Sequence, residues 1–310
     1  MTDSKIHDVI IIGAGPAALA AALYTSREDI ETLLFEKGVV GGLAAITDKV
    51  DNYPGFPDGI EGLTLADNLQ KQAERFGAVI EYGEVTSVKK SGDIIKLETT
   101  SGDMLARAVL VATGSEWVKL GIPGESEFYG RGVHNCATCD GAFYRDKRLV
   151  VVGSGNSAAQ EALFLTRFAS HIDILIRGDA WKASDVLIHE VEKNDKLRVH
   201  FNIATHEIIG IDGRITKVVG KDTKTGELKD YNTDGVFVFV GLKPVTYFLS
   251  ASGVQMDDRG FIKTDIKLAT AVPGVFAAGD VRSGATMQIA SAVGEGASAA
   301  LSIREYLEAK

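Results

Sequence analysis

The chain has 310 residues, of which 45 % are hydrophobic and 24 % are charged. This composition is that of a folded globular protein long enough for two domains of common size, and it excludes a largely disordered chain. The formal charge of -9, from 33 basic and 42 acidic residues, argues against a surface for nucleic acid or anionic membranes. We therefore expect neither nucleic acid nor a membrane among its partners.

Residues 9–26 carry no charge and are long enough to resemble a membrane span. Gly13, Gly15 and Pro16 interrupt the stretch, and no basic segment of the kind that starts a secretory signal precedes it. A buried strand that turns through glycines into an alanine-rich helix explains the stretch better. We expect a cytoplasmic protein.

A nucleotide-binding turn follows the first predicted strand, at residues 9–12. Its sequence, Gly-Ala-Gly-Pro-Ala-Ala at residues 13–18, fits G-x-G-x-x-[GA], whose glycines let backbone N–H groups and a helix N-terminus approach a pyrophosphate. The next strand, residues 32–35, ends at Glu36, which is placed to accept hydrogen bonds from the ribose hydroxyls of an adenine nucleotide. The alternative for Glu36 is a solvated charge at a strand end. This region is predicted to bind a dinucleotide.

The same pattern recurs in the second half of the chain. An apolar strand at residues 149–152 leads into Gly-Ser-Gly-Asn-Ser-Ala at residues 153–158, so two dinucleotide sites are predicted. Glu36 lies 23 residues after Gly13, and the same spacing from Gly153 reaches Ile176, followed by Arg177. A missing acid beside a cation accommodates a 2′-phosphate, which favours NADP over NAD. Arg177 could instead be a solvent-facing residue at a strand end.

Turn residues and apolar periodicity locate the remaining elements. Loops at residues 41–42 and 51–57 could bring backbone close to a flat ligand. A helix is predicted to include residues 161–165, an amphipathic helix covers 63–76 and an Ala/Gly/Ser-rich helix covers 288–301; strands are predicted at 79–82, 85–89, 94–99, 108–114, 235–241 and 275–280.

Cys136 and Cys139 are the only cysteines of the chain and lie just before the second glycine loop. A Cys-x-x-Cys pair near a βαβ unit is typical of dithiol redox chemistry. The alternatives are inert thiols or half of a zinc site with His134 as a third ligand, but zinc prefers four ligands and no second such pair exists. We predict a redox pair and no metal.

Asp140 directly follows the second cysteine. A carboxylate that lies beside a thiol pair in surroundings of low dielectric constant can hold a proton at neutral pH. It can then act as a general acid and base in thiol exchange. The alternative is that Asp140 caps the helix after the motif.

These motifs together resemble low-molecular-weight thioredoxin reductases, members of the flavoprotein disulfide reductases, over essentially the whole chain. The matching segments are residues 13–18, Glu36, Asn-Tyr-Pro-Gly-Phe at 52–56, Ala-Thr-Gly at 112–114, Cys-Ala-Thr-Cys-Asp at 136–140, residues 153–158, and Ala-Ala-Gly-Asp-Val at 277–281 with Gln288 beyond.

The resemblance implies an α/β fold of two Rossmann-like, three-layer ββα dinucleotide-binding domains, the second inserted into the first. The FAD domain would comprise residues 1–116 and 244–310, and the NAD(P)H-type domain with the cysteine pair residues 117–243. Homodimers are the norm of that family.

The resemblance also implies the site residues. FAD would contact Gly13, Gly15, Pro16, Ala17, Glu36, Gly42, Asn52, Val85, Ala112, Thr113, Gly114, Asp280, Gln288 and Ile289. NAD(P)H would contact Gly153, Gly155, Asn156, Ser157, Ala158, Arg177 and Lys182. Cys139 would face the flavin, Cys136 would attack the disulfide of thioredoxin or a similar small protein, and Asp140 would move the proton.

The chain departs from that family at the nicotinamide nucleotide. The usual signature, H-R-R-x-x-x-R, falls here on residues 176–182, so the His and one Arg are absent (Ile176 and Gly178) and the last Arg is Lys182. Lys offers a point charge but not a bidentate fork. Leu43 and Met287 replace a usual Gln and Arg. We predict a weakened NADPH site. The alternatives are a reductase that uses ferredoxin or a deazaflavin, a flavin dithiol oxidase that uses O2, and a redox sensor without turnover.

Overall fold

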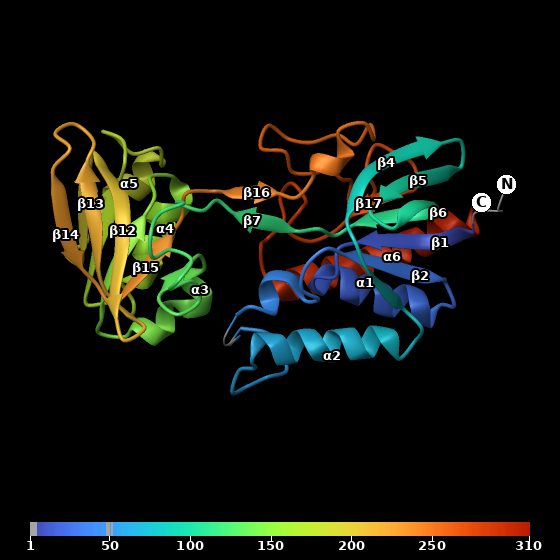
Figure 1. Cartoon of the computed structure of the whole chain (residues 1–310), viewed down its shortest axis with the longest axis horizontal. Coiled ribbons are helices and arrows are strands. Elements are labelled where there is room, and N and C mark those ends of the chain that lie inside the picture. Colours follow the sequence, from blue (N-terminus) through green and yellow to red (C-terminus); the bar gives the residue numbers. More distant parts are fainter. Residues whose placement is uncertain (1–4, 48–49, 51) are drawn as a thin grey trace. The chain divides into compact units, whose positions relative to one another are not determined.

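The computed structural model describes residues 5–47, 50 and 52–310, so Asp51 of the predicted loop at 51–57 lies outside it. The chain forms two compact units, one of Met1–Glu116 with Lys243–Lys310 and one of Trp117–Leu242 (Figure 1). The second boundary lies one residue before the predicted one. The second unit interrupts the sequence of the first.

The first unit is built on a seven-stranded sheet. Its strands are β1 (Ile6–Ile12), β2 (Thr32–Glu36), β3 (Val79–Tyr82), β4 (Val85–Ser91), β5 (Ile94–Thr99), β6 (Gly102–Val111) and β17 (Val275–Ala277). The order is β3-β2-β1-β6-β5-β4, with β17 also paired to β6. β3, β2, β1, β6 and β17 run parallel, whereas β5 is antiparallel to both its neighbours.

Alternate residues of β1 enter different cores, because successive side chains of a strand point to opposite faces. Val9 and Ile11 pack in the cluster that contains α1 (Pro16–Arg27) and α6 (Ile289–Glu308). Ile10 and Ile12 pack in a second cluster with residues of β4 and β5. The unit therefore has a helical layer, a parallel sheet and a β layer. α2 (Gly62–Glu74) also lies in this unit (Figure 1).

The small residues of α6 allow it to approach α1 closely. A Cβ atom at Gly296 would lie 2.1 Å from the carbonyl oxygen of Ala17, so no larger residue fits there. The sequence predicted that this helix ends near residue 301, so the predicted helix was too short. Ile303 and Leu307, four residues apart and buried, extend its apolar face to Glu308.

The second unit repeats the three layers. Its parallel sheet has the order β11-β10-β9-β15-β8. The strands are β8 (Val133–His134), β9 (Arg148–Val152), β10 (His171–Ile176), β11 (Leu197–Phe201) and β15 (Gly235–Val238). One face packs against α4 (Asn156–Leu165) and α5 (Asp185–Glu192). The other packs against an antiparallel sheet of β12 (Ile203–Ile211), β13 (Arg214–Asp222) and β14 (Leu228–Asn232). The predicted α/β class is confirmed.

The short elements lie around these layers. α3 (Ala137–Asp140) and the single turn η2 (Gly141–Tyr144) follow β8. The strands β7 (Ser115–Trp117) and β16 (Leu242–Pro244), where the chain passes between the units, pair as a two-stranded sheet. The turns η1 (Gly42–Ala44) and η3 (Tyr247–Leu249) belong to the first unit. None of the helices formed by residues 5–47, 50 and 52–310 is both long and apolar enough to span a bilayer.

Candidate functional site

The first glycine loop follows the carboxyl end of β1, where open α/β sheets bind ligands. Gly13 has φ 100°, and a Cβ there would lie 2.6 Å from the carbonyl oxygen of Ala112, which follows β6. A Cβ at Gly15 would meet nothing within 4 Å, so this side of the loop is open. α1 starts at Pro16 without a side-chain cap, which leaves the N–H groups of its first turn for an anion.

Glu36 ends β2 beside this loop. Its Oε2 accepts a hydrogen bond from the backbone N–H of Ala14 at 2.8 Å, and its Oε1 accepts one from the N–H of Gly38 at 2.6 Å. A carboxylate has about four acceptor positions, so Glu36 can still accept from two ribose hydroxyls. The two backbone donors hold it in the orientation that this would need.

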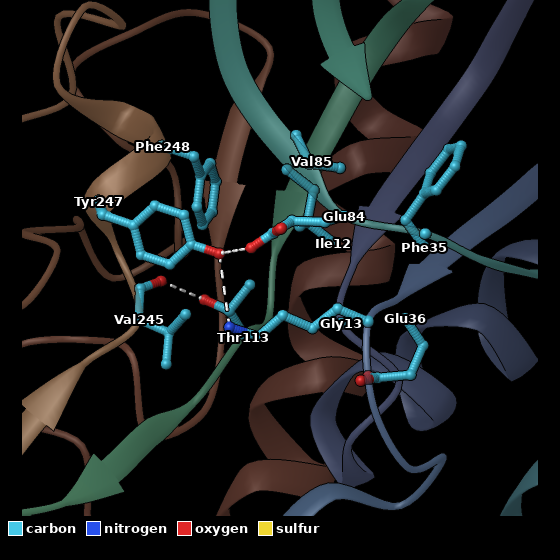
Figure 2. Close-up of a pocket in the computed structure, with 12 residues that line it drawn as sticks. Ile12, Gly13, Phe35, Glu36, Glu84, Val85, Thr113, Val245, Tyr247 and Phe248 are labelled. Atoms are coloured by element: carbon cyan, nitrogen blue, oxygen red, sulfur yellow. Dashed lines mark hydrogen bonds between the residues drawn. The ribbon is translucent and has the colours of Figure 1, made fainter. Parts of the chain in front are cut away.

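A pocket adjoins Glu36 (Figure 2). Its lining consists of Ile12, Gly13, Phe35, Glu36, Lys37, Gly83, Glu84, Val85, Thr113, Val245, Tyr247 and Phe248. Of these, Gly13, Glu36, Val85 and Thr113 were predicted site residues. The mixture of apolar walls with a few convergent polar groups is typical of a small-molecule site.

Three polar residues of this pocket were missed by the sequence analysis. The hydroxyl of Tyr247 donates to the carboxylate of Glu84 (Figure 2), and Lys37 Nζ lies 3.4 Å from the same hydroxyl and 5.2 Å from the ring centroid. Burial and the Glu84 carboxylate raise the pKa of Tyr247, although Lys37 opposes them. Tyr247 therefore stays protonated as the donor.

Of the other predicted flavin residues, Ala112, Thr113 and Gly114 follow β6, and Gln288 directly precedes α6. Thr113 Oγ1 donates to the carbonyl of Val245 at 2.7 Å, and Asn52 Nδ2 donates to Gln288 Oε1 at 3.0 Å. The latter bond joins the predicted loop to the N-cap of α6, which starts at Ile289. Ala112 is buried, Gly114 has φ 66°, and a Cβ at Gly42 would lie 3.7 Å from the Cα of Gly15.

Asp280 lies just beyond β17, at the carboxyl edge of the same sheet. Burial and the nearby Glu295 raise its pKa to about 6. Both causes oppose the charged form, so a ligand hydroxyl that donates to this carboxylate would relieve an electrostatic cost. An open glycine loop, an oriented Glu36 and a carboxylate short of donors together fit the pyrophosphate, ribose and polyol groups of a flavin dinucleotide.

The second glycine loop follows the carboxyl end of β9. Gly153 has φ 151°, and a Cβ there would lie 2.5 Å from the carbonyl oxygen of Phe239 and 2.8 Å from Ala158. A Cβ at Gly155 would meet nothing within 4 Å, as at Gly15. Ala158 is buried in the helical core, whereas Asn156 and Ser157 are exposed.

The segment after β10 is tied to this loop. The N–H of Lys182 donates to the carbonyl of Ser154 at 2.8 Å, and Asn156 Oδ1 accepts from the N–H of Ser184 at 2.8 Å. The backbone thus brings residue 182 next to the second glycine loop.

The second unit has no acidic residue at the position that corresponds to Glu36. Ile176 is buried and ends β10, while the side chains of Arg177 and Lys182 are exposed. Neither cation forms an ion pair with any residue that the structure describes. Gly178 is exposed, and a Cβ there would meet only the carbonyl oxygen of Ala180, at 3.9 Å. Two exposed cations, Arg177 and Lys182, and the open position at Gly178 thus follow β10.

The cysteine pair lies at the carboxyl edge of the same sheet, just after β8. Cys136 and Cys139 form a disulfide, with Cα atoms 5.3 Å apart. Cys136 is the N-cap of α3, and its Sγ accepts a hydrogen bond from the N–H of Cys139 at 3.2 Å. Asn135 Nδ2 donates to the carbonyl of Val238 at 2.8 Å, which holds the residue before Cys136 against β15. Both cysteines are half-buried.

Asp140 contacts the ring of His134. His134 Nδ1 lies 3.3 Å from Asp140 Oδ2, and His134 Nε2 lies 2.7 Å from the hydroxyl of Tyr144. Asp140 precedes η2 but makes no side-chain capping bond there, so the capping alternative is wrong. The sequence analysis considered His134 only as a zinc ligand and missed Tyr144, because the pattern of the motif gives no sign of either contact.

Known proteins were compared with this chain. The family model described as pyridine nucleotide-disulphide oxidoreductase matches residues 7–296. The chain belongs to this family. Thioredoxin reductase of Bacillus subtilis is 42 % identical over 99 % of this chain and 97 % of its own length, and that of Treponema pallidum is 41 % identical over 97 % of each.

Solved structures agree. The thioredoxin reductase of Streptococcus pyogenes has a TM-score of 0.93 at 39 % identity, covering 98 % of this chain and 99 % of the other. That of Giardia duodenalis has a TM-score of 0.92 at 33 % identity, covering 98 % and 100 %. The chain is thus an FAD-dependent disulfide oxidoreductase with two dinucleotide-binding domains, and the stated resemblance is confirmed.

Proposed function

We propose that this flavoenzyme is a thioredoxin reductase that passes electrons from a reduced nicotinamide nucleotide through FAD to the Cys136–Cys139 disulfide and on to thioredoxin or a similar small disulfide protein. The observation that carries the proposal is the disulfide itself. It follows the edge strand β8 and directly precedes Asp140, at the same edge of the sheet as the second glycine loop. The names of the relatives support the same substrate.

FAD would be held by the first unit, with its pyrophosphate at Gly13, Gly15 and the start of α1. Its ribose would be held by Glu36 and its polyol chain by Asp280. When bound, FAD supplies the two-electron chemistry that links the nucleotide to the disulfide. The protein residues orient it.

Thiol exchange would use the two cysteines unequally. The thiolate of Cys136 attacks one sulfur of the partner disulfide, and the other partner sulfur leaves and takes a proton from Asp140. Cys139 returns a proton to Asp140, attacks Cys136 of the mixed disulfide and releases the second partner sulfur as a thiolate, which takes a proton from solvent. The cysteine pair ends oxidised, and the partner gains two electrons and two protons.

A trapping experiment tests this order. Cys139→Ser should accumulate a mixed disulfide with thioredoxin whose own second cysteine is replaced by serine and whose first is activated as a mixed disulfide with thionitrobenzoate, because the Cys136 thiolate displaces the thionitrobenzoate; Cys136→Ser should accumulate none. Non-reducing electrophoresis and mass spectrometry of the adduct measure both. Trapping through Cys139 instead would reverse the two roles.

We also propose that NADPH is the donor and binds weakly. Arg177 and Lys182 are exposed cations near the second loop, which supports a 2′-phosphate site, but each charge-assisted hydrogen bond absent from it is worth about 1.5–3 kcal/mol. A specific observation favours a second candidate: with Ile176 and Gly178 at two signature positions, ferredoxin or a deazaflavin could be the donor.

Flavin bleaching distinguishes these donors. The purified yellow protein, mixed anaerobically with NADPH and then with NADH, should lose flavin absorbance slowly with NADPH and more slowly with NADH. Bleaching by reduced ferredoxin or deazaflavin alone would support the second candidate, and rapid thiol oxidation by O2 would support a dithiol oxidase.

The assembly and location are also part of the proposal. We expect a cytoplasmic homodimer, the norm of the family. Sedimentation equilibrium at micromolar concentration tests the dimer, and a single species of one chain mass would contradict it.

A further inference from the structure

His134 is a buried histidine that the proposed mechanism does not use. It lies on β8, two residues before Cys136, and only 8 % of it is exposed. Its two ring nitrogens face two different groups, the Asp140 carboxylate at 3.3 Å and the Tyr144 hydroxyl at 2.7 Å. A buried imidazole that is hydrogen-bonded to a phenol and faces a carboxylate has a polar role rather than only a packing one.

The phenol decides which ring nitrogen carries the proton. Burial and the carboxylates of Asp140 and Asp234 raise the pKa of Tyr144, so its hydroxyl stays protonated and can donate to Nε2 of His134. The ring proton of a neutral His134 then lies on Nδ1, which faces Asp140. The opposite tautomer would direct a lone pair at a carboxylate, which is unfavourable.

Packing fixes the ring in this orientation. The centroid of Phe237 lies 5.2 Å from that of His134 and 5.6 Å from that of Tyr144, and the two latter rings pack edge to face. Gly235 makes room for the phenol, since a Cβ there would lie 2.4 Å from the Tyr144 ring. The imidazole therefore has little freedom to turn away from the acid.

We propose that His134 is a positioning residue that holds Asp140 in place beside the cysteine pair, and that Tyr144 sets the tautomer in which it does so. This inference rests on the proposed role of Asp140 in thiol exchange. His134 Nδ1 lies 3.3 Å from Asp140 Oδ2 and restricts the orientation of the carboxylate, so removing the imidazole would leave that carboxylate free to turn away from the cysteine pair. The other titratable groups that face this cluster are Tyr129 and Asp234, with Glu125 behind Tyr129.

Two amide substitutions separate the two ring contacts. His134→Asn places an amide nitrogen near the position of Nδ1, toward Asp140, whereas His134→Gln places one near Nε2, toward Tyr144. The exchange step is measured alone, by mixing enzyme pre-reduced with dithiothreitol and freed of it with oxidised thioredoxin, quenching in acid and labelling thiols. This readout does not depend on the nucleotide donor.

His134→Gln and His134→Ala should lower the limiting exchange rate about tenfold, with little change in the half-saturating thioredoxin concentration. His134→Asn, which keeps a nitrogen toward Asp140, should restore the wild-type rate. Tyr144→Phe should lower the limiting rate in the same way but by less.

The outcomes separate the inference from the proposed function. Wild-type enzyme that exchanges with no disulfide protein would overturn the function and the inference together. Active wild-type enzyme, with a Gln variant and a Tyr144→Phe variant that keep its limiting exchange rate, would overturn the inference alone. Melting temperature and FAD content of each variant monitor folding, and Tyr144→Phe, which removes one hydroxyl, decides the question if the His134 variants do not fold.

Discussion

The two glycine loops have the same backbone arrangement, but the strand that follows each one ends in a different residue. Ile12 pairs with Phe35 just before the first loop, and Val152 pairs with Leu175 just before the second. Glu36 and Ile176 therefore occupy equivalent positions, each one residue further along its strand. In the proposed binding mode, the backbone of the motif would position a diphosphate in both units, and the residue at the strand end would determine which ribose chemistry can follow.

Breaking the first site at that residue should have the largest effect. Glu36→Ala removes two charge-assisted hydrogen bonds to ribose, worth about 1.5–3 kcal/mol each, so the Kd for FAD should rise at least about 100-fold. Fluorescence titration of apoprotein with FAD measures this. Asp67→Asn, an exposed carboxylate on α2, is the matched control. An unchanged Kd for the Glu36 variant would show that the ribose lies elsewhere.

Rebuilding the second site should have the next largest effect. Gly178→Arg with Lys182→Arg adds a guanidinium where the backbone is open and gives the other cation a bidentate fork. The KM for NADPH should fall about tenfold while that for NADH changes little. Stopped-flow flavin reduction measures both, with Lys224→Arg as the control. Equal gains for the two nucleotides would mean that Arg177 and Lys182 do not form a phosphate site.

Asp280 offers a pH-dependent test of the first site. Burial and the nearby Glu295 raise the pKa of Asp280 from its ordinary 3.8 to about 6, so the folded apoprotein keeps this proton to a higher pH than the unfolded chain and loses stability as the pH rises across that interval. Asp280→Asn apoprotein should therefore melt a few degrees higher than wild type at about pH 7.5 and show no such gain below the interval. It should also bind FAD more weakly. Equal melting temperatures at neutral pH would contradict this account.

The smallest expected effect concerns Tyr247. Tyr247→Phe removes the hydroxyl that joins Glu84 to Lys37 at the pocket but keeps the ring, so the Kd for FAD should rise only about threefold to tenfold. Tyr24→Phe, on the exposed part of α1, is a control with the same chemical change. A rise as large as that of the Glu36 variant would mean that the hydroxyl contacts the cofactor directly.

The sequence predicted those parts of the molecule that local periodicity encodes. The strands before both glycine loops, Glu36 and Ile176 were found by spacing alone, because a strand, a turn and a helix follow one another in the chain. The contacts of Tyr247 with Lys37 and Glu84 join residues 210 and 163 positions apart, which no local pattern encodes. The end of α6 was missed because its small residues hid the spacing of Ile303 and Leu307.

The interrupted sequence of the first unit has a consequence for how the chain is made. β17 pairs with β6, and α6 packs on α1, yet both come from residues that leave the ribosome after the whole second unit. The second unit is continuous in sequence and can fold as soon as it emerges, since domains generally fold as units during synthesis. Until β17 and α6 have been synthesised, the first 116 residues expose the apolar surface of α1 and the side of β6 that pairs with β17. Chaperone demand during synthesis should therefore fall on the N-terminal segment.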